Sequence, residues 1–187
     1  LLTQELNHRV RNILPIIGSM VKLSAAKAAN VPTFALALDG RIGALARAHD
    51  VLLSGAISGM TPSEILSAEL AAFPNFGART QIRSSDEPHL SSHTAQGLAL
   101  VFHELITNAI KYGAFSNHEG LVRVQINGSS NSTVIRWREQ GGPRVETPTE
   151  TGFGSLLIKR ANGANSKVEL SYPPDGLACT ITLGEGD

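Results

Sequence analysis

Cysteine is almost absent from this chain of 187 residues, in which Cys179 is the single thiol. One thiol excludes an internal disulfide framework and a cysteine-rich zinc site, and it is typical of a protein in a reducing compartment. Aromatic residues are also few, at 5%. Because 42% of the residues are hydrophobic, a core can form, and we expect it to consist mainly of Leu, Ile, Val and Ala.

Neither sign of charge is in excess, since 16 Lys and Arg residues balance 16 Asp and Glu residues. General nucleic-acid binding and a polybasic membrane anchor both need a basic surplus, so neither is expected. No apolar run approaches the ~18–20 residues that span a bilayer, and no signal peptide is recognisable. We therefore expect a cytoplasmic protein, and the first residue, Leu1 in place of Met, suggests a fragment of a longer chain.

The N-terminal third of the sequence has the pattern of two helices. Apolar residues recur at helical spacing over residues 2–29 and again over residues 33–53, and Pro32 separates the two runs. This pattern predicts an antiparallel helical hairpin, in which Gly40 and Gly43 would allow a partner helix to approach closely. The apolar stripe would pair with a second copy to form a four-helix bundle, or alternatively would pack on the rest of the same chain.

A change of composition at residues 54–59 predicts a linker, and we divide the chain into domains of residues 1–56 and 57–187. A capping box at residues 61–64 opens a helix to about residue 73, and Ser91 or Ser92 caps a long helix that ends at Tyr112-Gly113. Helices interleaved with antiparallel strands predict an α+β sandwich, in which helices cover one sheet. The expected strands are residues 80–83, 121–126, 133–137, 167–172 and 177–183.

The end of the long helix is the most informative stretch. At helical spacing, Glu104, Asn108 and the Lys111-Tyr112 pair fall on one face. The amide oxygen of Asn108 could ligate Mg²⁺, and Lys111 could meet the charge of a phosphate. The alternative is an ordinary amphipathic helix with a solvated polar face.

Two further stretches carry candidate chemistry. Glu139 is followed by Gly141-Gly142, and a carboxylate there could accept a hydrogen bond from an exocyclic amine such as that of adenine. The residues 152–155, Gly-Phe-Gly-Ser, would expose backbone N–H groups to phosphate at a helix start, although turn formation explains them about as well. Early in the first helix, the imidazole of His8 is a candidate nucleophile, with Asn12 one turn later.

These stretches occur in an order that resembles a sensor histidine kinase of the HWE family, within the kinases that share the Bergerat-type ATP-binding fold. The resemblance covers essentially the whole chain. It implies an N-terminal helical hairpin, half of a four-helix bundle if the protein is dimeric, followed by a Bergerat-type α/β sandwich. The matching motifs are Leu6-Asn7-His8-Arg9-Val10-Arg11-Asn12, Arg47-Ala48-His49-Asp50-Val51-Leu52, His103-Glu104-Leu105 with Asn108-Ala109 and Lys111-Tyr112-Gly113, Trp137-Arg138-Glu139, and Gly152-Phe153-Gly154-Ser155.

The resemblance implies an ATP-dependent protein-histidine kinase, a phosphotransferase of a two-component signalling system. His8 would accept the γ-phosphoryl group of ATP and pass it to an aspartate in the receiver domain of a response regulator, while Asn12 would orient a water molecule or that aspartate. Glu104 would serve catalysis beside Asn108, which would hold Mg²⁺, and Glu139 would read adenine. The other residues implied in nucleotide binding are His103, Lys111, Tyr112, Gly141, Gly142, Gly152, Phe153, Gly154 and Ser155. For His103 and Trp137, packing is the alternative.

The implied partners are a response regulator, a second copy bound through residues 1–56, and an upstream sensory domain outside this sequence. One alternative is a phosphorelay adaptor that keeps His8 and the dimer but no longer uses ATP. Another is a Bergerat-fold ATPase or serine/threonine kinase. Intact Asn108 and Glu139 argue against the adaptor, and the motif around His8 argues against the ATPase.

Overall fold

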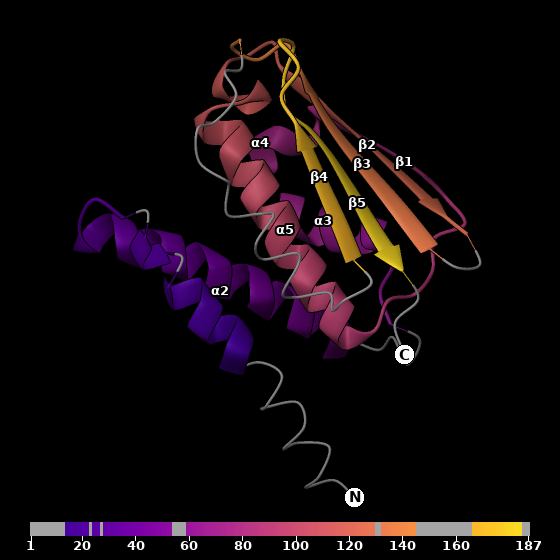
Figure 1. The fold of residues 1–187 in the computed structure, drawn as a ribbon, viewed down its shortest axis with the longest axis horizontal. Helices are drawn as coiled ribbons and strands as arrows, with labels where there is room; N and C mark the ends of the chain where they lie inside the picture. The colour runs from indigo at the N-terminus through magenta and orange to yellow at the C-terminus, as the bar shows by residue number, and fades with distance from the viewer. Residues whose placement is uncertain are drawn as a thin grey trace, which may run out of the picture.

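The computed structural model describes residues 14–22, 24–26, 28–53, 59–129, 132–144 and 166–184. Residues 14–22 and 24–26 are helical, and the chain then turns and returns alongside as helix α2 (Val31–Leu53), as Figure 1 shows. The predicted helical hairpin is therefore confirmed over these residues. The predicted linker at residues 54–58 and the loop and short helix expected within residues 145–165 lie outside the described residues.

Helix α2 begins two residues earlier than predicted, because proline is tolerated in the first turn of a helix. Asn30 caps this end: its side-chain oxygen accepts the backbone N–H of Thr33 at 2.9 Å. In return, the Thr33 hydroxyl accepts the backbone N–H of Asn30 at 3.2 Å. The turn between the two helices of the hairpin is thus fixed by local hydrogen bonds.

The next elements follow the predicted capping signals. The Thr61 hydroxyl accepts the backbone N–H of Glu64, and the Glu64 carboxylate accepts that of Thr61, so helix α3 (Pro62–Ala71) starts with the expected capping box. Ser91 caps the long helix α5 (Ser92–Lys111). Two short elements were not predicted, namely helix α4 (Pro74–Gly77) and the 3₁₀ helix η1 (Ala114–Ser116).

Five strands form one sheet in the order β1-β2-β3-β5-β4. The prediction that the strands are antiparallel is wrong for β1, which pairs with β2 in parallel. The reason is the connection: α5 carries the chain back across the sheet between β1 and β2, and such a crossover leaves the two strands in the same direction. The strands are β1 (Thr80–Ser85), β2 (Leu121–Gly128), β3 (Ser132–Gln140), β4 (Ser166–Ser171) and β5 (Ala178–Gly184).

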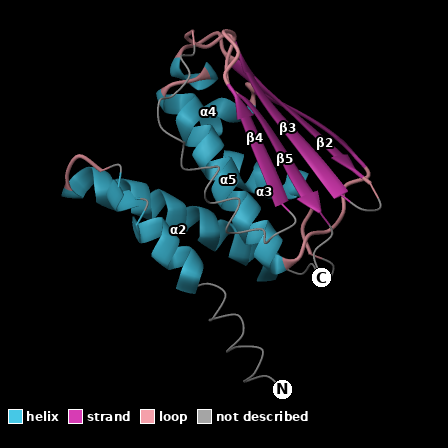
Figure 2. Ribbon diagram, viewed as in Figure 1, coloured by secondary structure: helices cyan, strands magenta, loops and turns pink. Residues whose placement is uncertain are grey.

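The helices α3 and α5 cover one face of the sheet, which makes the fold an α+β sandwich as expected (Figure 2). Side chains of the strands alternate between this covered face and solvent. The core between the layers is mainly aliphatic, with Phe102, Phe115 and Trp137 as its aromatic members. From the strands it includes Val122, Val124, Ile126, Ile135, Ile181 and Leu183, and from α5 it includes Leu98, Val101, Leu105 and Ile106.

Helix α2 packs against α5, so part of the hairpin does pack on the rest of the chain. Gly40 is where the two helices approach, since a Cβ atom there would lie 3.0 Å from His103 Nε2. Other apolar side chains of the hairpin stay exposed. No helix within the described residues is long and apolar enough to cross a membrane.

Cys179 lies on β5 directly opposite Trp137 of β3, and burial raises the pKa of its thiol to about 12. Only the thiolate is nucleophilic, so we expect the folded chain to resist a maleimide at about pH 8 and the denatured chain to react fully. Mass spectrometry of both samples measures this. A Cys179→Ser variant controls for other sites, and rapid full labelling of the folded chain would contradict the burial.

Candidate functional site

Three of the predicted polar residues form an exposed row at the C-terminal end of α5. The helix ends at Lys111, where the backbone N–H groups of Tyr112 and Gly113 donate to the carbonyls of Asn108 and Ala109. The side chains of Asn108, Lys111 and Tyr112 all remain exposed at this end. An amide oxygen and a cation are therefore presented together to solvent, as the sequence predicts.

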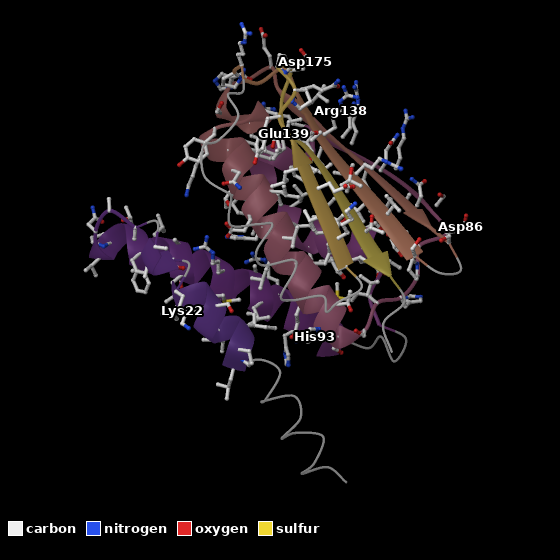
Figure 3. All side chains as sticks on the ribbon, viewed as in Figure 1. Lys22, Asp86, His93, Arg138, Glu139 and Asp175 are labelled. Carbon is white, nitrogen blue, oxygen red and sulfur yellow. The ribbon has the colours of Figure 1, made fainter. Side chains whose placement is uncertain are left out.

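Glu139 lies at the end of β3, between the sheet and the end of α5 (Figure 3). Its side chain is buried, with 2% exposure. One carboxylate oxygen accepts the backbone N–H of Ala114 at 2.8 Å, and the other accepts the indole N–H of Trp137 at 3.3 Å. Burial raises the pKa of Glu139, and these two hydrogen bonds partly oppose that shift. The carboxylate thus connects β3 with the start of η1, the segment that follows α5.

Glycines allow the end of β3 to approach the segment that follows α5 closely. A Cβ atom at Gly113 would overlap the Glu139 carboxylate, and one at Gly142 would lie 2.9 Å from Ala114 Cα. Gly141 has a φ of 72°, in the left-handed region that favours glycine. Gly142 therefore lies against Gly113 and Ala114, directly after α5, and Gly141 lies against Glu119 and Gly120.

Glu104 precedes that row on α5 but, unlike the row, it is covered by the hairpin. Its carboxylate is paired with the Arg41 guanidinium of α2: Arg41 Nε lies 2.8 Å from one oxygen and Arg41 Nη2 lies 3.0 Å from the other. Glu104 is 6% exposed, whereas Asn108, one turn later, is open to solvent. Arg41 is not among the site residues predicted from the sequence. A signal was available, because Arg41 lies on a face of α2 that otherwise carries small residues, at Ala37, Ala44 and Ala48.

His103 belongs to a third group, on the side of α5 that faces α2 and α3. Its Nδ1 atom lies 3.5 Å from a Glu69 carboxylate oxygen and has no hydrogen-bond partner, although it is buried. Arg47 holds the same carboxylate with two hydrogen bonds, of 2.7 and 3.1 Å. His103 and Asn108 point about 140° apart around the helix, so the structure does not bring His103 to the exposed row.

The other predicted site residues, His8, Asn12, Gly152, Phe153, Gly154 and Ser155, lie outside the described residues. Across the part of the chain that the structure describes, no three His, Cys, Asp or Glu side chains gather to hold a metal ion. The exposed Asn108 amide suits a different kind of site, in which the phosphates of a nucleotide supply most of the oxygen ligands of Mg²⁺.

Comparisons with known proteins show a family and a fold that this chain resembles. Residues 5–87 match the model of the HWE histidine kinase family. The chain is 35% identical, over 97% of its length, to the blue-light-activated histidine kinase of Brucella anthropi, but spans only 38% of that protein. It shares its fold with the histidine kinase domain of the Erythrobacter litoralis EL346 blue-light-activated kinase (TM-score 0.64, 20% identity, 96% of this chain and 91% of that one). It shares its fold also with histidine kinase ThkA, solved in complex with the response regulator TrrA (TM-score 0.51, 13% identity, 99% and 61%).

The packing at Gly113 leads to a stability prediction. We expect Gly113→Ala to lower the free energy of unfolding by about 1–3 kcal/mol, because the added methyl group must displace the Glu139 carboxylate. Gly77→Ala is the matched control, since a Cβ atom there meets nothing within 4 Å. Urea unfolding followed by circular dichroism measures both variants. Equal stability of Gly113→Ala and the unaltered chain would contradict the contact.

Proposed function

Because the chain belongs to the HWE histidine kinase family, we propose that it is the catalytic core of an ATP-dependent protein-histidine kinase. The observation that supports this most directly is the meeting of two chain segments. The exposed row of Asn108, Lys111 and Tyr112 ends α5, and the buried carboxylate of Glu139 ends β3 beside it. In this proposal the exposed row binds phosphate and Glu139 binds adenine, and the contact of Glu139 with Ala114 keeps the two close together.

In this proposal the exposed row receives the triphosphate. Asn108 holds Mg²⁺ together with phosphate oxygens, and the ion neutralises charge that develops during phosphoryl transfer. Lys111 adds a positive charge to the same place. Each oxygen of Glu139 accepts one hydrogen bond from the protein and retains a second lone pair. Because the side chain is only 2% exposed, Glu139 must be uncovered before such a lone pair accepts the exocyclic amine of adenine. Gly141 and Gly142 form the adjoining wall.

The chemical step is a transfer from ATP to His8. A nitrogen of the His8 imidazole forms a bond to the γ-phosphorus, and the bond from that phosphorus to the bridging oxygen breaks, which leaves ADP. Glu104 serves this step, and Asn12 orients the group that receives the phosphoryl later. The receiving group is an aspartate of a response regulator. This assignment is supported by ThkA, a histidine kinase of similar fold whose structure was solved in complex with a response regulator.

We propose further that residues 1–56 and 57–187 act as separate domains, joined by a hinge at residues 54–59, and that the hairpin dimerises. The first helix exposes Leu14, Ile17 and Val21, to 61%, 36% and 41%. These residues recur at helical spacing along one face, which suits pairing with the same face of a second copy. The curated relative is more than twice as long as this chain and is named for activation by blue light, so a sensory domain elsewhere in the whole protein also belongs to the proposal.

The kinase activity is tested by incubation with Mg²⁺ and γ-labelled ATP. We expect label that is acid-labile and base-stable, and that falls to background in His8→Ala and Asn108→Ala, because the first removes the acceptor and the second a ligand of Mg²⁺. His89→Ala, which alters an exposed histidine of the second domain, should keep the label. If the unaltered chain takes no label from ATP but accepts phosphate at His8 from a phosphorylated receiver domain, the protein is an adaptor instead.

Dimerisation is tested by the molar mass in light scattering. We expect the unaltered chain to have twice the mass of one copy, and the double variant Ile17→Glu with Val21→Glu to have the mass of one, because two carboxylates on this stripe would be buried without partners. Val31→Glu, at the turn end of the hairpin, should remain dimeric. A monomeric unaltered chain would contradict the proposal.

A further inference from the structure

The hairpin covers Glu104 and leaves the exposed row of Asn108, Lys111 and Tyr112 open to solvent. Helix α2 runs across α5, as Figure 1 shows, and it covers α5 at Glu104. One turn further along α5, Asn108 is exposed, and Lys111 and Tyr112 follow in the open. A nucleotide can therefore reach the exposed row while Glu104 stays out of its reach.

The contact that covers Glu104 is specific. The planar guanidinium group of Arg41 makes a bidentate contact with the Glu104 carboxylate: Nε donates to one oxygen at 2.8 Å and Nη2 donates to the other at 3.0 Å. Both side chains are more than nine-tenths buried. With its oxygens occupied in this way, the Glu104 carboxylate is not free to act on a reacting group.

From this geometry we propose that Arg41 is a positioning residue that acts through Glu104 and holds the kinase in a resting state. The inference rests on the proposed function, in which Glu104 serves transfer to His8. Autophosphorylation then requires that the Arg41–Glu104 pair separate, so the position of the hairpin sets the fraction of molecules that are competent for transfer.

Arg41 is also tied to the hairpin itself, which couples the pair to any movement of its helices. Arg41 Nη1 donates to the Ser24 hydroxyl of the first helix at 2.8 Å and to the Ala37 carbonyl of α2 at 3.4 Å. The arginine is thus held from both helices of the hairpin. A change in the packing of one helix on the other would move Ser24 relative to Glu104, and Arg41 cannot then keep both contacts.

A second ion pair at the same interface provides a matched control. Arg47, two turns along α2, holds Glu69 of α3 with two hydrogen bonds and makes no contact with Glu104. Removal of the Arg47 charge weakens the attachment of the hairpin to the second domain but leaves Glu104 covered. A variant of Arg41 therefore releases Glu104 and loosens the interface, whereas a variant of Arg47 only loosens the interface. Comparison of the two variants distinguishes these effects.

The experiment measures kcat and KM for ATP in autophosphorylation, together with ATP affinity at equilibrium, for the whole chain and its variants. We expect Arg41→Gln to raise kcat about fivefold or more, at the lower end of typical coupling between sites, with ATP affinity unchanged. Ser24→Ala should raise kcat roughly two- to fivefold, because it removes one hydrogen bond that holds Arg41. Arg47→Gln should not raise kcat.

Additional variants show whether the effect passes through Glu104. In the double variant Arg41→Gln with Glu104→Gln the gain should disappear. If Arg41→Gln does not fold, as judged by circular dichroism, Ser24→Ala decides the question, since it leaves no charge unpaired. An unchanged or lower kcat with ATP affinity retained, or an equal rise in Arg47→Gln, overturns the proposal. Absence of ATP binding in the unaltered chain would instead refute the proposed function.

Discussion

The buried carboxylate of Glu139 is the contact on which the geometry of this domain depends. A carboxylate that leaves water costs free energy unless it is hydrogen-bonded, and Glu139 obtains donors from two parts of the chain, the backbone of η1 and the indole of β3. The connection at Gly113 must therefore come close enough to reach β3. This places the C-terminal end of α5 near the end of the central strand β3, where Asn108 and Lys111 face solvent. The exposed row and the buried acid are consequences of one packing constraint.

The hairpin is attached to helices α3 and α5 by charged pairs as well as by apolar contacts. Arg41 binds Glu104 and Arg47 binds Glu69, while Ala44 and Ala48 supply small apolar surfaces between them. Buried ion pairs add little net stability, but they fix orientation, because any other arrangement leaves a charge without a partner. An interface of this kind sets the position of the hairpin on α3 and α5 more than it adds to stability.

Local signals in the sequence predicted most of the described fold and the polar row at the end of α5. The capping box at Thr61, the cap at Ser91 and the exposed row at the end of α5 each depend on a few neighbouring residues, and each is confirmed. The parallel pairing of β1 with β2 and the contact between Arg41 and Glu104 depend on how distant segments meet, 63 positions apart in the second case. Helical spacing placed Glu104 on the correct face of α5, but it could not show that α2 covers that part of the face.

The contact between Trp137 and Glu139 gives the domain a built-in optical probe. Trp137 is the single tryptophan of the chain, and its indole N–H donates to the carboxylate that we assign to adenine. Indole emission responds to nearby charge and to the loss of a hydrogen bond. The tryptophan emission of the protein, excited selectively at wavelengths that tyrosine does not absorb, therefore comes from one residue beside the proposed nucleotide site, so occupancy of that site can be followed without a dye or a label.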